Sequence, residues 1–352
     1  MASLTRTAYM SRMIIKYGGM VLLVFILLRW GVKAGVAYWI AAHPEPAAPP
    51  TVRYGRLPKI IFPKQNLVGF EFYLETADGE LPEISDRVKV YFSPQISTAF
   101  LALESAKKKA VKMGFSAEPE KIREDQFRFY NGTDNRTLIM NVLTGAFQLS
   151  YPYLEDQTLI NPSSLLAEEQ AKERALSFLS GAGVAYDDLK GGEKLVSFWK
   201  IKPSTLVEAM ALSEADLVRV DFFRQPIEDE EGVKKIMGTS PQKASVSVLL
   251  SGGGMESKQI VEVNFAYAPI DLEENSTYPL KTAAQAWQEV KAGQYYLAQK
   301  PREGTRAAVR RAYLAYFEPN TTGNFIMPIW VFEGDGGVVI YVSAVAEEWL
   351  VD

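Results

Sequence analysis

One stretch near the start constrains this chain more than any other. Residues 17–42 are dominated by apolar side chains and contain only two charged ones, Arg29 and Lys33. At the helical rise of about 1.5 Å per residue, such a run exceeds the roughly 30 Å hydrocarbon core of a bilayer. We therefore interpret residues 17–42 as a transmembrane anchor, and the lipid bilayer is the first partner that the sequence predicts.

Two other interpretations of this stretch are open. A cleaved signal peptide would use the basic start, the apolar run Tyr17–Leu28 and a small-residue cleavage site at residues 35–37. The apolar pattern continues past that site to Ala42, however, which favours an anchor. A buried core helix fits less well, because the run from residue 18 to residue 28 offers no polar face.

Arg29 and Lys33 are four residues apart and therefore share one helical face. Near the bilayer centre each costs about 2.5–3.5 kcal/mol on insertion scales, unless it reaches the interface or finds a partner. We expect this face to contact an acidic or polar side chain on the membrane helix of an unknown membrane or envelope protein. Trp30, Tyr38 and Trp39 are the expected interfacial aromatics.

The flanking charges predict an orientation. The positive-inside rule places residues 1–16, with three cations, in the cytoplasm as a short tail. The bias is not clean, because four cations follow the anchor: Arg53, Arg56, Lys59 and Lys64. The proline-rich segment 43–64 predicts an extended linker that holds a folded body away from the bilayer. We expect the N-terminus to be cytoplasmic and the bulk of the chain extracytoplasmic.

Composition narrows the chemistry. The chain has no cysteine, which excludes disulfides, thiol nucleophiles and thiolate metal sites. Its one histidine, His43, lies in the linker, so histidine-dependent triads and zinc sites are not expected in the body. A net charge of -4 gives no reason to expect nucleic acid. We expect no cofactor, no metal and no catalysis, although carboxylate chemistry, a serine–lysine dyad and a metal site with oxygen ligands remain open.

Beyond the linker, helical and strand-like segments alternate. Helices are expected at residues 97–115, 167–183 and 281–293, each followed by strand candidates. We therefore predict an α+β body with three consecutive units, residues 65–160, 161–275 and 276–352, each combining a helix with an antiparallel sheet. Among the strand candidates, residues 137–151 are taken as one long strand.

Several motifs have a structural and a chemical interpretation. In "EGDGG" (333–337), Asp335 suits a metal, but Asp-Gly between two apolar runs predicts a hairpin turn. The acidic run 228–231 predicts a surface loop rather than a calcium site. Four arginines are expected on a solvated helix face: Arg302, Arg306, Arg310 and Arg311. Seven aromatics are expected to pack internally, with a peptide groove as the alternative: Trp199, Phe222, Phe223, Tyr295, Tyr296, Trp330 and Tyr341.

The third predicted unit carries a family resemblance. It contains "TAAQAWQEV", "AYLAYF", "MPIWVFEG" and "YVSAV" in this order. Over residues 280–345 this pattern resembles the C-terminal part of YycI- and YycH-type regulatory ectodomains and is similar to the wider group of PepSY-like domains. The closing strand has Ser343-Ala344 where those proteins typically have Asn-Ala.

The resemblance implies a helix packed on a small antiparallel sheet, tethered outside the membrane by one N-terminal helix. It also implies a protein that acts by binding, as a modulator of sensor kinases or peptidases. We therefore predict a non-catalytic, membrane-tethered binding or regulatory protein that recognises a protein or peptide. The alternatives are a structural cell-envelope protein and a carboxylate-dependent envelope hydrolase.

Overall fold

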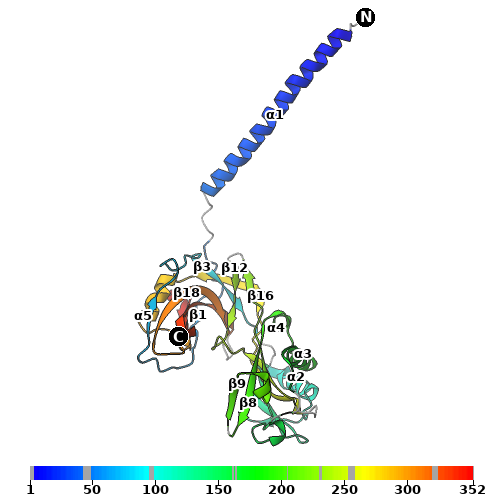
Figure 1. The fold of residues 1–352 in the computed structure, drawn as a ribbon, viewed down its shortest axis with the longest axis vertical. Helices are drawn as coiled ribbons and strands as arrows, with labels where there is room; N and C mark the ends of the chain where they lie inside the picture. The colour runs from blue at the N-terminus through cyan, green and yellow to red at the C-terminus, as the bar shows by residue number, and fades with distance from the viewer. Residues whose placement is uncertain are drawn as a thin grey trace. The chain divides into compact units, whose positions relative to one another are not determined.

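The computed structural model (Figure 1) describes residues 4–42, 49–94, 99–160, 162, 165–203, 205–229, 232–252, 258–318 and 324–351. His43 lies outside the described residues, as do residues 43–48 of the predicted linker. The chain divides into two compact units, residues 1–49 and residues 50–352. Each unit is described by itself.

The first unit is a single helix, α1 (Leu4–Ala42), which begins well before residue 17. Its segment Tyr9–Trp39 has 31 residues and a mean hydropathy of 1.9, and no part of its most apolar stretch is buried. At about 1.5 Å per residue the segment is about 46 Å long, which is enough to cross a bilayer. Among the described residues, α1 is the one helix with this length and apolarity.

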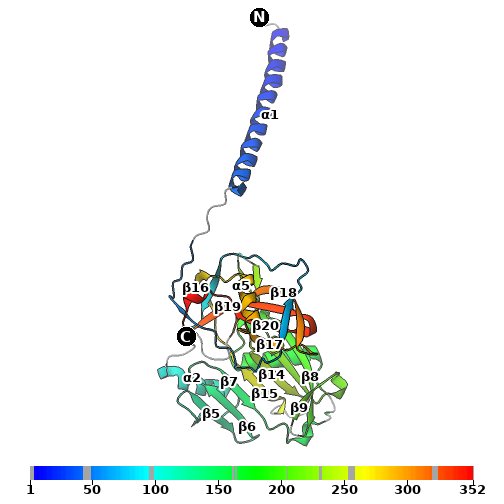
Figure 2. The ribbon, with the colours of Figure 1, turned by 90° about the vertical axis from the view of Figure 1, so that its left-hand side faces the viewer.

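The second unit is a mixed α+β body, which confirms the predicted fold class. Its first layer is a nine-stranded sheet in which every neighbouring pair is antiparallel. The strands lie side by side in Figure 2. In spatial order they are β4 (Glu120–Lys121), β5 (Gln126–Asn131), β6 (Arg136–Asn141), β7 (Phe147–Ser150), β15 (Ile260–Phe265), β14 (Val246–Ser251), β10 (Leu217–Phe222), β8 (Lys194–Lys202) and β9 (Thr205–Ala209).

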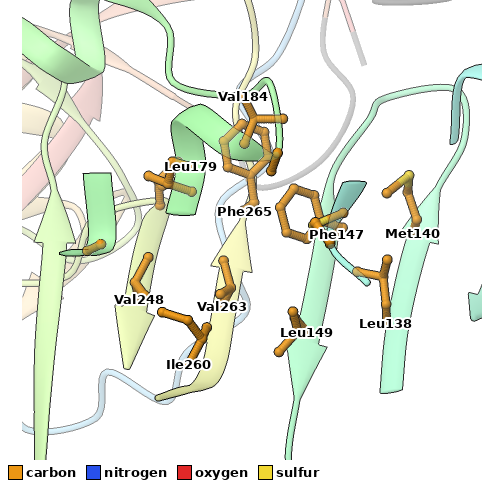
Figure 3. Packing of buried hydrophobic residues seen from close by; sticks show 14 of the residues in the cluster. Leu138, Met140, Phe147, Leu149, Leu179, Val184, Val248, Ile260, Val263 and Phe265 are labelled. Carbon is orange, nitrogen blue, oxygen red and sulfur yellow. The ribbon is translucent and has the colours of Figure 1, made fainter. Parts of the chain in front are cut away.

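Two helices, α2 (Ala99–Lys112) and α3 (Glu168–Gly181), cover one face of this sheet. Both present alanines at helical spacing, which allows the helix backbones to approach the strands closely. These alanines are Ala102, Ala106, Ala110, Ala171 and Ala175, and all are buried. They pack with large strand residues such as Leu138, Phe147 and Phe265 in one continuous core (Figure 3). The short helix α4 (Asp187–Gly191) follows α3.

The strand expected over residues 137–151 is in fact two strands, β6 and β7, joined by a tight turn. The Asn141 side chain accepts hydrogen bonds from the backbone N–H groups of Leu143 (3.0 Å) and Thr144 (3.1 Å). Gly145 then takes a φ of +73°, which a residue with a side chain rarely adopts. The single-strand prediction was wrong because side-chain hydrogen bonds of Asn favour turns even inside an apolar run.

The second layer is an eight-stranded sheet that combines distant parts of the chain. Its central strands, β18 (Arg306–Phe317) and β19 (Phe325–Gly334), are paired along most of their length. On one side of β19 follow β20 (Val339–Ser343) and then β17 (Tyr296–Gln299) as the edge strand. β13 (Ile236–Met237) and β2 (Glu71–Leu74) pair with β18, while β3 (Arg87–Phe92) pairs with β19 and with β16 (Asp271–Pro279). β19 and β20 form the hairpin that "EGDGG" predicted.

Helix α5 (Ala283–Lys291) packs on one face of this second sheet. Its start is fixed by a capping box, in which the Thr282 hydroxyl accepts from the Gln285 N–H and the Gln285 side chain accepts from the Thr282 N–H. Trp287 and Val290 then point into a core with Phe332 and Trp330. Two smaller pairings complete the body: β1 (Leu57–Pro58) with β21 (Leu350–Val351), and β11 (Ile227–Asp229) with β12 (Gly232–Lys234).

Residues 50–74, which we call the strap, belong to the body, although residues 50–64 were predicted to be part of the linker. The strap pairs with the C-terminal strand through β1 and with β18 through β2. Between these strands Ile60 and Phe62 pack beside Tyr341. The Gln65 amide both donates to and accepts from the Leu297 backbone, at 2.9 Å each way. The strap therefore holds the first segment of the body against its last strands.

The sheets do not follow the three predicted segments. The nine-stranded sheet takes β4 to β7 from residues 65–160 and its remaining five strands from residues 161–275. The eight-stranded sheet combines β2 and β3 with strands beyond residue 235. The alternation of helices and strands along the chain reveals the fold class but does not identify which strands pair.

The predicted arginine-rich helix face is also corrected. Arg306, Arg310 and Arg311 lie on strand β18. Each faces a carboxylate: Arg306 pairs with Glu71 (3.3 Å), Arg310 with Glu75 (3.3 Å) and Asp335 (2.7 Å), and Arg311 with Glu333 (2.6 Å). These arginines are therefore neutralised surface pairs rather than a basic patch.

Candidate functional site

The membrane-helix residues predicted from the sequence all lie on α1 and are exposed. Arg29 and Lys33 are one turn apart, as their spacing requires. Trp30, Tyr38 and Trp39 are 75%, 77% and 63% exposed. A helix with this pattern can contact lipid or another helix around its whole circumference.

The body carries a groove beside the strap, which we call the strap groove. It encloses about 640 Å³ and lies between the strap, the end of β20 and the start of α5. Its lining comprises Lys59, Ile60, Phe62, Lys281, Glu289, Gln294, Tyr295, Tyr341, Val342, Ser343, Glu347 and Leu350. Apolar and aromatic surface thus alternates with charge, as in sites that bind ligands with both kinds of group.

Charges in the strap groove are arranged as a chain of ion pairs. The buried Lys281 ammonium lies 2.7 Å from Glu289 and 3.4 Å from Glu347. Glu347 also pairs with Lys59 of the strap at 3.1 Å. The Lys59 hydrogen bond and the nearby Lys281 charge lower the pKa of Glu347 against the opposing effect of burial. At neutral pH this rim therefore offers fixed ionised groups of both signs.

Two hydroxyls that line the strap groove have no hydrogen-bond partner within the described part of the chain. They belong to Tyr341, which is fully buried, and to Ser343, two residues further along β20. Burial raises the pKa of Tyr341, so its hydroxyl keeps its proton. A buried hydroxyl without a partner costs about 1–3 kcal/mol. Both oxygens are shielded from solvent behind the groove surface, so a ligand with polar groups supplies the missing hydrogen bonds only when the groove wall opens.

A second groove lies on the other side of Tyr295 and is lined mainly by the strap. Its residues are Gln65, Asn66, Leu67, Val68, Phe70, Glu71, Phe72, Val290, Lys291, Gly293 and Tyr295. Tyr295 lines both grooves, so the two lie close together at the end of the eight-stranded sheet. Both are candidate binding regions, and residues of the strap line each of them.

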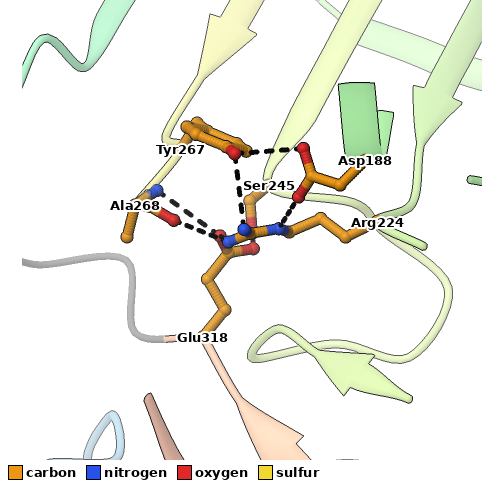
Figure 4. Close-up of polar contacts among 6 residues, drawn as sticks. All are labelled: Asp188, Arg224, Ser245, Tyr267, Ala268 and Glu318. Carbon is orange, nitrogen blue, oxygen red and sulfur yellow. Dashed lines mark hydrogen bonds and ion pairs between the residues drawn. The ribbon is translucent and has the colours of Figure 1, made fainter. Parts of the chain in front are cut away.

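A buried polar cluster joins the two sheets (Figure 4). Arg224, just beyond β10, lies between Asp188 of α4 and Glu318 at the end of β18, at 2.7 Å from each carboxylate. Its guanidinium also donates to the Ala268 carbonyl at 2.6 Å and lies over the Tyr267 ring at 4.4 Å. Arg224 and Glu318 side chains are each only 5% exposed.

In this cluster, which we call the joint, the positive and negative charges balance. Burial opposes the charge on Arg224, but Glu318 and Asp188 outweigh it, and the pKa of Arg224 is raised. Burial also raises the pKa of Tyr267, and Asp188 adds to the effect while Arg224 opposes it. The Tyr267 hydroxyl donates to Asp188 at 3.0 Å. Each charged group in the joint thus has an opposite charge or a hydrogen-bond partner, as a buried cluster requires.

The sequence-predicted aromatics fall into different environments. Tyr295 and Tyr341 line the strap groove. Tyr296 packs on Phe62 with ring centroids 5.0 Å apart, and Phe222 and Trp330 are fully buried. The charged groove residues were missed, because nothing in the sequence distinguishes Lys281 or Glu347 from surface residues of the same type.

In the described part of the chain, the carboxylates with shifted pKa values are all shifted downwards. The pKa is lowered for Asp156, Asp187, Asp335 and Glu347, in each case with a Lys or Arg partner. A carboxylic general acid needs the opposite, a raised pKa. Among the described residues there is also no group of three or more acidic, histidine or cysteine side chains placed to hold a metal. Asp335, in particular, binds Arg310.

Comparisons with known proteins add little to this geometry. No protein-family model and no curated protein matches the chain. It is similar to an uncharacterized protein from Eubacterium rectale ATCC 33656 of known crystal structure, with 11% identity, a TM-score of 0.40, and coverage of 73% of this chain and 83% of the other. The observed class is therefore an α+β protein whose N-terminal helix is long and apolar enough to span a membrane.

Replacing Arg224 tests the joint between the sheets. We expect Arg224→Met to lower the free energy of unfolding by about 3–5 kcal/mol, because it leaves Glu318 buried without a counter-charge. The measurement is urea unfolding of the full chain in detergent, followed by tryptophan fluorescence. Arg128→Met is the matched control, because Arg128 pairs with Glu120 at the surface at 3.3 Å, where water screens the pair and a much smaller loss is expected. Equal small losses in both variants would contradict this role.

Proposed function

We propose that the chain is a single-pass membrane protein whose extracytoplasmic body binds a protein or peptide partner and acts through that binding, without catalysis. The YycI- and YycH-like resemblance of residues 280–345 agrees with such a role, and this segment contributes most of the strap groove. In this proposal α1 anchors the body and residues 1–16 lie in the cytoplasm.

The observation that carries the binding role is the pair of unpartnered hydroxyls, on Tyr341 and Ser343. An extended peptide presents backbone N–H and C=O groups and is therefore suited to pair with them. The charged rim of Lys59, Lys281, Glu289 and Glu347 adds contacts for charged termini or side chains. The apolar residues Ile60 and Phe62 supply the surface whose burial favours binding.

If the groove binds a partner, removing the two hydroxyls should weaken partner binding without lowering the stability of the body. Tyr341→Phe with Ser343→Ala removes hydroxyls that are unsatisfied in the free body, so the thermal unfolding midpoint is expected to stay the same or rise. Photo-cross-linking of the full chain to its partner in cells is expected to fall about fivefold or more, because each lost hydrogen bond weakens binding by about 1 kcal/mol.

Tyr278→Phe is the matched control for that variant. Tyr278 is also fully buried, but its hydroxyl donates to the Gly55 carbonyl at 2.9 Å. This control should lose about 1 kcal/mol of stability and keep its cross-links. If the groove variant loses stability and retains its cross-links, its hydroxyls have a structural role and the proposed binding region is wrong.

The orientation is tested with single cysteines, which the natural chain lacks. Met210 is 93% exposed beside β9, so Met210→Cys should react with a membrane-impermeant maleimide on intact cells. Ala2→Cys, in the predicted cytoplasmic tail, should react only after lysis. Leu138→Cys, at a fully buried position, reports background. The reverse pattern for the first two positions would place the body in the cytoplasm and remove the extracytoplasmic proposal.

The cationic face of α1 is tested separately. Arg29→Leu with Lys33→Leu should leave membrane insertion intact or improve it, since both charges are costly in hydrocarbon. Co-purification of a partner membrane protein in mild detergent should fall, because its acidic or polar side chain loses its counterpart. Arg12→Leu with Lys16→Leu is the matched control, with the same spacing nearer the N-terminus. Unchanged co-purification in the first variant would show that this face binds no partner helix.

A further inference from the structure

The strap has an unusual charge distribution. From residue 50 to residue 70 it contains no acidic residue, while four cations occur between residues 53 and 64. Two of these are paired with the body, Arg53 with Glu274 at 2.8 Å and Lys59 with Glu347 at 3.1 Å. Arg56 and Lys64 are exposed and form no ion pair with any residue that the structure describes. The strap therefore presents two free positive charges to its surroundings.

Two apolar side chains of the strap are nearly fully exposed. Ile61 is 87% exposed and Val68 is 85% exposed. The first is held between Ile60 and Phe62, which pack against the eight-stranded sheet. The second lies between Leu67 and Phe70, which pack in the core below α5. Because their neighbours are anchored, both side chains are fixed on the outside of the body.

Chain length limits where the strap can be. It begins at residue 50, eight residues after Ala42, the last residue of α1. A fully extended chain of eight residues spans at most about 29 Å. If α1 crosses a bilayer, the first residue of the strap can therefore lie no further than about 29 Å from the end of the anchor.

We propose that the strap is a membrane-surface contact, in which Arg56 and Lys64 bind anionic lipid headgroups while Ile61 and Val68 enter the interfacial layer. Basic residues next to a membrane helix are attracted to anionic lipids, and exposed apolar residues among them add burial. This contact also gives a role to cations that follow the anchor, whose presence makes the orientation expected from the positive-inside rule less clear. It rests on the proposed anchor but holds for either orientation of the chain.

The test uses the full chain in lipid nanodiscs, with an environment-sensitive NBD fluorophore on a single cysteine. Ile61→Cys should shift its emission to shorter wavelength in nanodiscs of phosphatidylcholine mixed with phosphatidylglycerol, relative to detergent. The shift should be smaller in phosphatidylcholine alone, and high salt should reduce it because screening weakens headgroup attraction. Met210→Cys, on the nine-stranded sheet, should show no shift. Val24→Cys within α1 reports whether the anchor has inserted.

A pair of charge variants tests whether the lipid-dependent shift needs the strap cations in particular or only the total charge of the body. Arg56→Gln with Lys64→Gln should abolish most of the lipid-dependent shift at Ile61→Cys. Lys121→Gln with Lys202→Gln, an equal change of charge at two exposed positions of the nine-stranded sheet, should retain it. The thermal unfolding midpoint of each variant checks that the body remains folded.

The outcomes distinguish this inference from the anchor itself. If the label at position 24 shows insertion but the label at position 61 reports water in both lipids, the strap does not touch the membrane and the inference is overturned. A lipid-independent shift at position 61 that needs an added protein would assign the strap to a protein partner and overturn it as well. If position 24 also reports water, the anchor fails, and both proposals fail with it.

Discussion

The packing of the body depends on one buried cation. Arg224 joins the nine-stranded sheet to Glu318 at the end of β18, and Asp188 and Tyr267 complete its surroundings. Such a cluster contributes little net stability when its charges balance, but each charge requires the others to be present in their places. It therefore favours one arrangement of the two sheets over the many that apolar surfaces alone would allow. The parallel pairing of β13 with β18 forms beside it and links the same two parts of the body.

The strap complements this joint at the other end of the eight-stranded sheet. Gln65 satisfies backbone groups of Leu297 that would otherwise lie at the open edge of β17. Covering an edge in this way prevents unwanted strand pairing. The same segment lines both grooves and presents the free cations Arg56 and Lys64. Edge protection thus depends on a stretch that in sequence resembles an extended linker, and the proposed ligand binding and membrane contact depend on the same stretch.

Sequence reasoning identified the fold class and most of the regular elements because periodicity is a local property. Helix α5 was predicted from the spacing of Ala283, Trp287 and Val290 on one face, and the structure adds the capping box at Thr282. Partner choice is not local: the pairing of β2 with β18 or of β7 with β15 leaves no mark that a single sequence reveals. For the same reason the strap groove was only partly foreseen. Tyr341 was recognised as an aromatic of interest, whereas Lys281 became a groove residue through contacts with Glu289 and Glu347 that form only in the folded body.

The strap has a mechanical consequence as well. Chain entering the body at Thr51 is first bound to β16, through hydrogen bonds of Val52 to Thr277 (3.0 Å) and of Arg53 to Ser276 (2.8 Å), and then to β21 through β1. Any force on the tether is therefore carried by several backbone and side-chain hydrogen bonds at once before it reaches β19 and the rest of the sheet. Because β1 pairs with the last strand and the strap forms one wall of the strap groove, tension that detaches the strap would free the last strand and take the groove apart in the same step.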